Sequence, residues 1–210
     1  MTEYVVSGNP DSRVLQRVAR ILNAGGLAAI PTDTSWSLVC SISSAGGIAR
    51  LNKFIKPGAI RPLTVICASI TQASALCEIN TAAFRTIKPL IPGPYVFVLP
   101  STRAATRDFD LKRAEIGVRI PDNAVALGLV ETLGHPLLSL TAKRSMLEDY
   151  SDEAAFPEDE LFAAGWELEE LPDLELILDP GEDNRRELAT VLDLRSGAVE
   201  VLRQGIGVYP

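Results

Sequence analysis

Short apolar runs alternate with helical patterns along this 210-residue chain, and this alternation constrains the fold more than any other feature. The run at residues 27–31 follows Gly25 and Gly26 and ends in a proline. A short apolar run between turn signals is typical of a strand buried on both faces of a sheet. Further strands are predicted at residues 37–41, 63–67, 95–99, 116–120, 137–140, 174–178, 190–194 and 199–202. Helices are predicted at residues 11–24, 44–54, 81–88 and 124–133.

Strands that alternate with helices indicate an α/β protein with three layers. The step from residues 27–31 to residues 37–41 is too short for a parallel crossover, so part of the sheet must be antiparallel. We therefore predict a twisted mixed β-sheet with helices on both faces, in one domain over residues 1–210. Acidic residues crowd residues 145–172, where we predict a mobile loop with one short helix near residues 157–164.

The bulk composition favours a protein of a reducing compartment. Cys40, Cys67 and Cys77 lie in or beside apolar runs, with neither a close pair nor the spacing of a metal site. They are predicted to be buried free thiols. Apolar runs reach neither the length of a membrane span nor the pattern of a signal peptide, so we expect a cytoplasmic protein without membrane contact.

The net charge of −7 is divided unevenly along the chain. Residues 1–49 are neutral, residues 50–144 carry +7, and residues 145–210 carry −14. An acidic protein is a poor general binder of nucleic acid, because phosphate repels it. The basic central segment instead favours a small anionic ligand.

Several common catalytic signatures are missing from the sequence. It contains no Gly-rich phosphate loop, dinucleotide fingerprint or nucleophile elbow. The one histidine, His135, precedes a proline in a predicted turn, where a structural role is the better interpretation. We predict no metal site in the protein itself, since clusters with metal-ligand spacing are absent.

Hydroxyl and cationic side chains gather instead where the predicted strands end. Thr32, Asp33 and Thr34 follow the first buried strand, and ligands of open α/β sheets bind at such ends. Similar residues stand near other strand ends: Lys53, Lys56, Arg61, Arg119, Ser139, Thr141, Lys143, Thr190 and Arg203. Chemistry on a nucleotide phosphate depends mainly on positioning and charge neutralisation, which such groups supply.

The order of these motifs resembles that of the YrdC-like family, and most of all its YciO branch. The motifs are Gly25-Gly26, Pro31-Thr32-Asp33-Thr34, Pro92-Gly93-Pro94, Val118-Arg119-Ile120-Pro121 and Leu138-Ser139-Leu140-Thr141-Ala142. The resemblance implies a twisted α/β fold with a concave basic cleft. It also implies a nucleotidyltransferase that makes threonylcarbamoyl-adenylate from threonine, bicarbonate and ATP, releases pyrophosphate, and serves tRNA modification.

The resemblance also implies roles for individual residues. Lys53, Lys56 and Arg61 would be catalytic, and Thr32, Thr34 and Arg61 would bind the amino acid. The nucleotide pocket would consist of Arg119, Ser139, Thr141, Lys143, Thr190 and Arg203. Magnesium would be held through the phosphates of ATP, the sequence offering no cage of its own.

Four departures from the family pattern predict weak or altered synthase activity. The family's Lys-x-Arg pair is replaced by Lys53 and Lys56 at a different spacing, and its Ser-x-Asn ends in Lys143 here. Val96 replaces a threonine, and two glycines are missing after Ser35. Lysine cannot form the bidentate phosphate contact that arginine forms.

Two alternatives to synthase activity remain open. One is a non-catalytic protein that binds double-stranded RNA or tRNA in the same cleft. The other is a regulatory domain that senses a nucleotide or an amino acid. A row of aromatic residues for base stacking is absent, and this favours a small ligand over RNA.

Overall fold

The computed structural model describes residues 1–55, 64–109, 114–148 and 158–209. The helices are α1 (Ser12–Asn23), α2 (Ala45–Asn52), α3 (Ile70–Ser74), α4 (Thr81–Ile87), α5 (Arg103–Phe109) and α6 (Ala124–Leu133). Four 3-10 helices are η1 (Lys88–Leu90), η2 (Arg144–Glu148), η3 (Glu158–Glu160) and η4 (Gly165–Leu168). The strands are β1 (Thr2–Tyr4), β2 (Ala28–Ile30), β3 (Ser37–Ser41), β4 (Thr64–Ile66), β5 (Tyr95–Pro100), β6 (Glu115–Arg119), β7 (Leu137–Thr141), β8 (Leu176–Asp179), β9 (Thr190–Asp193) and β10 (Glu200–Arg203).

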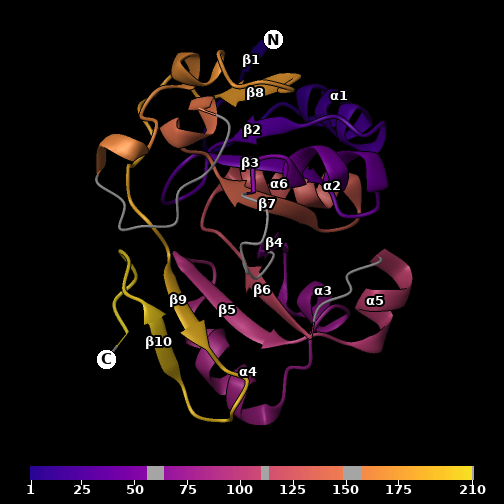
Figure 1. Cartoon of the computed structure of the whole chain (residues 1–210), viewed down its shortest axis with the longest axis vertical. Coiled ribbons are helices and arrows are strands. Elements are labelled where there is room, and N and C mark those ends of the chain that lie inside the picture. The colour runs from indigo at the N-terminus through magenta and orange to yellow at the C-terminus, as the bar shows by residue number, and fades with distance from the viewer. Residues whose placement is uncertain (56–63, 110–113, 149–157, 210) are drawn as a thin grey trace.

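These strands form one mixed sheet in the order β1-β8-β2-β3-β7-β4-β6-β5-β9-β10. Strands β1, β8 and β2 are parallel at one side of the sheet, whereas β2, β3, β7 and β4 pair antiparallel. Figure 1 shows the sheet turning along its width: β8 and β2 run across the view, and β5 and β9 run obliquely down it. This turn is the accumulated right-handed twist expected of a wide sheet.

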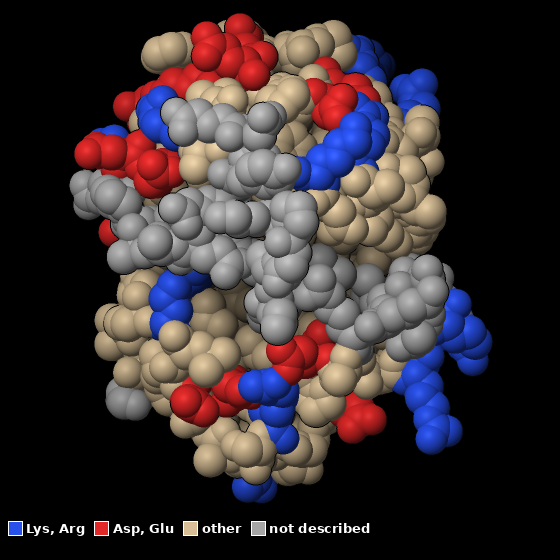
Figure 2. Space-filling view, viewed as in Figure 1, with Lys and Arg blue, Asp and Glu red and all other residues tan. Residues whose placement is uncertain are grey.

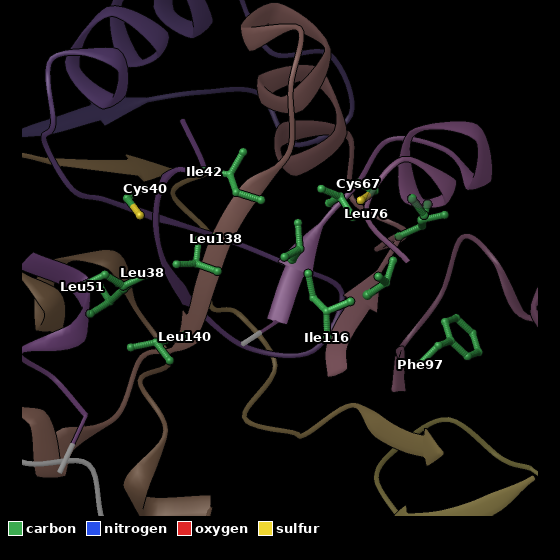
Figure 3. Packing of buried hydrophobic residues seen from close by; sticks show 14 of the residues in the cluster. Leu38, Cys40, Ile42, Leu51, Cys67, Leu76, Phe97, Ile116, Leu138 and Leu140 are labelled. Carbon is green, nitrogen blue, oxygen red and sulfur yellow. The ribbon is translucent and has the colours of Figure 1, made fainter. Parts of the chain in front are cut away.

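Alternation along the strands gives the sheet two apolar faces, each covered by helices. Ala28 and Ile30 of β2 face α1 and α6, in one cluster with Leu22 and Leu129. The opposite face of the sheet, which includes Ala29 of β2, packs against α2, α3, α4 and η4. Figure 3 shows part of this second cluster, with Leu38, Cys40, Leu51, Leu138 and Leu140 gathered in one layer. The predicted mixed α/β sheet with helices on both faces is therefore confirmed.

Helix ends follow from side-chain caps that the sequence carries. Asp11 accepts a hydrogen bond from the Arg13 N–H at the start of α1, and Asn123 does the same for Ala126 at the start of α6. Gly134 ends α6 with a φ of +75°, a left-handed conformation that favours glycine. The predicted bounds of both helices are correct to within about one residue.

The structure also contains elements that the sequence pattern did not predict. These are β1, α3 and α5, which are short. In the acidic segment, Leu161, Phe162, Leu168 and Leu171 are buried in the core, so the described residues 158–172 pack against the domain. Within the range predicted for a short helix the structure has η3, a 3-10 helix of three residues, and η4 begins directly after that range. Residues 149–157 lie outside the described residues. Within the described ranges, none of the helices is both long and apolar enough to cross a membrane.

Candidate functional site

The loop that follows β2 carries three polar residues to a position against β6. The strand order separates β2 from β6 by β3, β7 and β4, so the loop must cross a face of the sheet to reach β6. Arg119, the last residue of β6, meets it there. The contact joins two motifs that are more than eighty residues apart in the sequence.

The hydrogen bonds from Arg119 to this loop come from one nitrogen. Its Nη2 donates to Asp33 Oδ1 at 2.6 Å, to Thr34 Oγ1 at 2.8 Å and to Thr32 Oγ1 at 3.3 Å. Thr32 Oγ1 in turn donates to the Ser35 carbonyl at 2.6 Å, which tightens the loop. The guanidinium thus fixes the direction of both threonine hydroxyls.

Burial dominates the electrostatics of this cluster. Arg119 is 5% exposed, Thr32 3% and Thr34 0%. Burial lowers the pKa of Arg119, and the charge and hydrogen bond of Asp33 oppose that shift. Asp33 Oδ2 and Arg119 Nε are both buried and have no hydrogen-bond partner among the described residues. Unsatisfied buried polar atoms are rare and call for an explanation such as a bound ligand or water.

Strand register places other predicted residues on the same face of the sheet as Arg119. Ile66 pairs with Arg119 and with Leu137, and both Ile66 and Leu137 face α1 and α6. Ser139 and Thr141 lie two and four residues after Leu137 in β7, so their side chains point to the same face of the sheet as Leu137. The Ser139 hydroxyl donates to the Thr64 carbonyl at 3.1 Å. The structure thus brings Thr32, Thr34, Arg119, Ser139 and Thr141 to one face.

Other predicted residues lie elsewhere in the structure. Lys53, at the end of α2, is exposed and pairs with Asp173 at 2.9 Å, and this hydrogen bond lowers the pKa of Asp173. Lys143 is 2% exposed, and its backbone forms a bridge with Leu161. Lys56 and Arg61 lie outside the described residues.

Thr190 and Arg203 hold the C-terminal segment to β9. Thr190 Oγ1 donates to the Gly207 carbonyl at 2.5 Å and accepts from the Gly205 N–H at 2.9 Å. Arg203 donates from Nη2 to the Ala189 carbonyl at 2.9 Å. Thr190 lies two residues before Leu192 in β9, so both side chains point to the same face of the sheet. Leu192 belongs to the cluster on the face opposite Arg119. Their predicted role in nucleotide binding stays a prediction.

The sequence analysis placed Asp33 at a strand end suited to ligands but did not predict its pairing with Arg119, and it gave no role to residues 182–187. Glu187 donates its N–H to the Thr34 carbonyl at 3.2 Å, which brings this segment against the loop. A cavity of about 200 Å³ lies between the two, lined by Ser7, Pro31, Thr32, Asp33, Asn123, Pro180, Glu182, Asp183, Asn184 and Arg185. The adjacent basic residues Arg185 and Arg186 in an otherwise acidic segment are the sequence feature that marks it.

Charge on the surface is mixed on the face seen in Figure 2. Basic and acidic side chains are interspersed there. The predicted concave basic cleft therefore stays a prediction. In the part of the chain that the structure describes, no group of three or more His, Cys, Asp or Glu is placed to hold a metal ion.

Sequence comparison relates the chain to one family. The family model of Sua5, YciO and YrdC, described as "Telomere recombination", matches residues 20–205. The chain is 30% identical to the uncharacterized protein YciO of Escherichia coli (strain K12), over 97% of this chain and 95% of the relative. It is 27% identical to a threonylcarbamoyl-AMP synthase of Mus musculus, over 86% of this chain and 61% of the mouse protein.

Solved structures agree with the sequence comparison. The crystal structure of E. coli YciO matches with a TM-score of 0.82 and 27% identity, covering 99% of this chain and 97% of that chain. A crystal structure of P. abyssi Sua5 complexed with L-threonine matches with a TM-score of 0.80 and 25% identity, covering 98% of this chain and 57% of that chain.

Proposed function

This chain belongs to the family of Sua5, YciO and YrdC, and on that basis we propose that it binds ATP with threonine or a related small acid. It then joins them to give an acyl-adenylate of the threonylcarbamoyl-AMP type. The mouse relative is named as a threonylcarbamoyl-AMP synthase, and the P. abyssi structure contains L-threonine. The E. coli relative, which covers nearly the same length, carries no named activity.

The proposed reaction is an attack on the α-phosphate of ATP. Threonine first takes up bicarbonate at its nitrogen and loses water, giving an N-carboxylate. A carboxylate oxygen then forms a bond to the α-phosphorus, and the bond from that phosphorus to the pyrophosphate oxygen breaks. The pyrophosphate leaves with the electron pair. Mg²⁺, which commonly binds to proteins through substrate phosphates, would offset the negative charge of these phosphates.

The observation that carries this proposal is the cluster of Arg119 with Thr32, Asp33 and Thr34. It holds two hydroxyls in fixed directions beside a buried cation, on the face that also presents Ser139 and Thr141. Preorganised polar groups are the main source of catalysis in phosphoryl and nucleotidyl transfer. We assign to Arg119 the positioning of Thr32 and Thr34, because its Nη2 is already occupied by the loop.

The remaining assignments follow the family pattern. Lys53, Lys56 and Arg61 would neutralise the phosphates and the carboxylate. In the described structure Lys53 is 66% exposed in its side chain and held only by a surface ion pair, so a triphosphate can compete for it with little loss. Ser139, Thr141, Lys143, Thr190 and Arg203 would surround the nucleotide.

The proposal is tested by binding and by turnover. ATP with Mg²⁺ should raise the melting temperature of the protein, and threonine with bicarbonate should raise it further, because ligands of the native state stabilise it by mass action. Pyrophosphate release should require all three substrates and should fall at least tenfold in Thr34→Val. Thr86→Val, which removes an exposed hydroxyl bonded only to its own helix, is the matched control.

Two results would count against the proposal. One is the absence of a thermal shift with millimolar ATP, with or without threonine. The other is tight binding of a duplex RNA or a tRNA that falls steeply with salt, in the absence of any effect of ATP. That second result would favour the RNA-binding alternative.

A further inference from the structure

The connection from β8 to β9, residues 180–189, passes beside the candidate site. β8 pairs with β2 and β9 pairs with β5, so this connection runs from one half of the sheet to the other (Figure 1). On its way the Glu187 N–H donates to the Thr34 carbonyl at 3.2 Å. The Leu188 carbonyl then accepts from the Ile206 N–H at 2.9 Å. The connection is therefore held between the loop that follows β2 and the segment that follows β10.

A cavity of about 440 Å³ lies beside the middle of this connection. Its lining residues are Arg185, Arg186, Glu187 and Ile206. Glu187 bonds to Thr34, which is proposed to bind the amino acid. Ile206 follows Gly205, whose N–H donates to Thr190 Oγ1 at 2.9 Å, and Thr190 is proposed to surround the nucleotide. The cavity thus lies between the residues proposed for one substrate and those proposed for the other.

Backbone hydrogen bonds fix the chain on either side of the two arginines. Ahead of them, the Asn184 N–H donates to the Ala163 carbonyl at 2.8 Å. The same carbonyl accepts from Trp36 Nε1 at 3.0 Å, and Trp36 is fully buried. After the arginines comes the bond from Glu187 to Thr34. A backbone that is already ordered lowers the entropic cost of binding a ligand.

The side chains of Arg185 and Arg186 are not used in holding the fold. Both residues are exposed, and neither guanidinium forms a hydrogen bond or an ion pair with the described residues. Arginines elsewhere in the described ranges do pair with carboxylates: Arg17, Arg50, Arg119, Arg144 and Arg195. Adjacent cations repel one another, and an anion between them relieves that repulsion.

The number and geometry of these donors narrow the class of ligand. A guanidinium binds phosphate oxygens through two parallel N–H bonds, whereas an ammonium acts as a point charge. A single carboxylate or monophosphate engages one guanidinium, but a diphosphate group offers oxygens to both. Two guanidinium groups against the one carboxylate of Glu187 leave the cavity lining with a net positive charge.

We propose that Arg185 and Arg186 bind the β- and γ-phosphates of ATP and then the pyrophosphate that leaves. This assignment rests on the proposed function and adds two residues to its site. The family's Lys-x-Arg pair has no arginine at its place here, and the two arginines supply the bidentate contacts that Lys53 and Lys56 cannot form. As the bond to the α-phosphorus breaks, negative charge moves onto the pyrophosphate, where the guanidinium groups stabilise it.

The test compares ATP with AMP by calorimetry in the presence of Mg²⁺. In the double variant Arg185→Lys with Arg186→Lys the charge is kept and the bidentate contacts are lost. We expect ATP to bind at least tenfold more weakly than to the wild type, and AMP to bind within twofold, because AMP lacks the β- and γ-phosphates.

The matched control is Arg20→Lys. Arg20 is exposed on α1, and its Nε donates to the Gln16 carbonyl of its own helix. This variant should leave the affinity for both nucleotides unchanged, and each variant is first shown to melt like the wild type. Unchanged ATP affinity in the double variant would overturn the proposal. An equal loss for ATP and AMP would also overturn it, because the arginines would then act on the adenosine or the α-phosphate.

Pyrophosphate alone, as a third probe, separates this proposal from the proposed function. If the wild type binds neither nucleotide but binds pyrophosphate, and the double variant does not, the arginines form a phosphate site and only the proposed function fails. If ATP binds and threonine-dependent pyrophosphate release is the same in both proteins, the proposed function stands and this assignment fails. Binding of none of the three probes would overturn both.

Discussion

Arg119 Nη2 and Asp33 Oδ1 lie 2.6 Å apart, although their strands stand four positions apart in the sheet. The side chain of Arg119 is 6% exposed and that of Asp33 12%, so the pair lies in the interior. A buried ion pair of this kind contributes more to the specificity of a loop conformation than to net stability. The same nitrogen of Arg119 also donates to both threonine hydroxyls, so their direction depends on the position of this arginine.

Removing the arginine is expected to cost stability as well as binding. Arg119→Ala leaves Asp33 buried without its counter-charge, and such losses cost about 3–5 kcal/mol. Urea unfolding measures this value. Arg17→Ala breaks the ion pair with Glu3, where Arg17 is about half exposed, and should cost less than about 1 kcal/mol. Equal costs for the two variants would contradict the buried role of Arg119.

Gly205→Ala should destabilise the C-terminal segment. A Cβ at this position would lie well inside 3.0 Å of the Leu188 carbonyl oxygen, which is backbone and cannot turn away. We expect a loss of about 3 kcal/mol, at the upper end for overpacking. Gly8→Ala meets nothing within 4 Å and should change stability by less than about 0.5 kcal/mol. If Gly205→Ala melts like wild type, the segment is not held against β9 as described.

The buried cysteines predict that stability falls in alkali. Burial raises the pKa of Cys40 and of Cys77 from 9.0 to about 12. Below pH 9 both states keep the thiols protonated, so stability is unaffected. Between pH 9 and 12 only the unfolded state ionises, and each thiol then lowers the free energy of unfolding by about 1.4 kcal/mol per pH unit.

A single variant isolates this effect. Lysines and tyrosines also titrate in that range, but they are common to the wild type and Cys77→Ala, so their contribution cancels. Urea midpoints at pH 8, 9, 10 and 11 should fall less steeply in Cys77→Ala. Parallel pH profiles of the two proteins would show that Cys77 is accessible to solvent in the native state.

Restoring two residues of the synthase pattern should raise catalysis in part. Phe97 pairs with Val118, and both side chains lie on one face of the sheet. Their neighbours Val96 and Arg119 therefore both point to the opposite face. Val96→Thr adds a hydroxyl on that face, and Lys143→Asn replaces a buried cation by a neutral amide. We expect a several-fold rise in threonine-dependent pyrophosphate release for the double variant.

Two findings would contradict this expectation. Brisk pyrophosphate release by the wild type would show that the departures from the family pattern do not limit the rate. A double variant that folds but releases pyrophosphate no faster than the wild type would indicate that the spacing of Lys53 and Lys56 limits the rate. Val98→Thr, a buried change on the same strand, controls for a general effect of a new hydroxyl.

Local patterns predicted the larger elements of the fold well. The helix with Asp11 as its cap and the one with Asn123 as its cap both begin where the side chain predicts, because capping is a local interaction. β1 was missed because a strand of three residues, with Tyr4 exposed, has no apolar run. It exists through its pairing with β8, which no local pattern reports.

The candidate site was predictable in its composition but not in its geometry. The family pattern assigned Thr32 and Thr34 to the amino acid and Arg119 to the nucleotide, whereas in the structure Arg119 donates to both threonine hydroxyls. It placed the charge of Arg119 at a strand end facing a cleft, whereas the structure pairs it with Asp33 in the interior. The cavity lined by Asp33 and Arg185 depends on a tertiary contact between residues 31–33 and 180–185, for which the sequence has no pattern.

The place of β8 between β1 and β2 has a consequence for synthesis on the ribosome. Glu175, beside β8, accepts from the Leu27 N–H at 2.6 Å across 148 residues of chain, and it also pairs with Arg50. While the chain emerges, β2 therefore lacks one of its two neighbours until residues 176–179 have left the exit tunnel. Contacts over such distances form slowly, and unpaired strand edges invite association in the meantime. β1 has no partner and β2 has one unpaired edge until β8 has been synthesised and has paired with both strands.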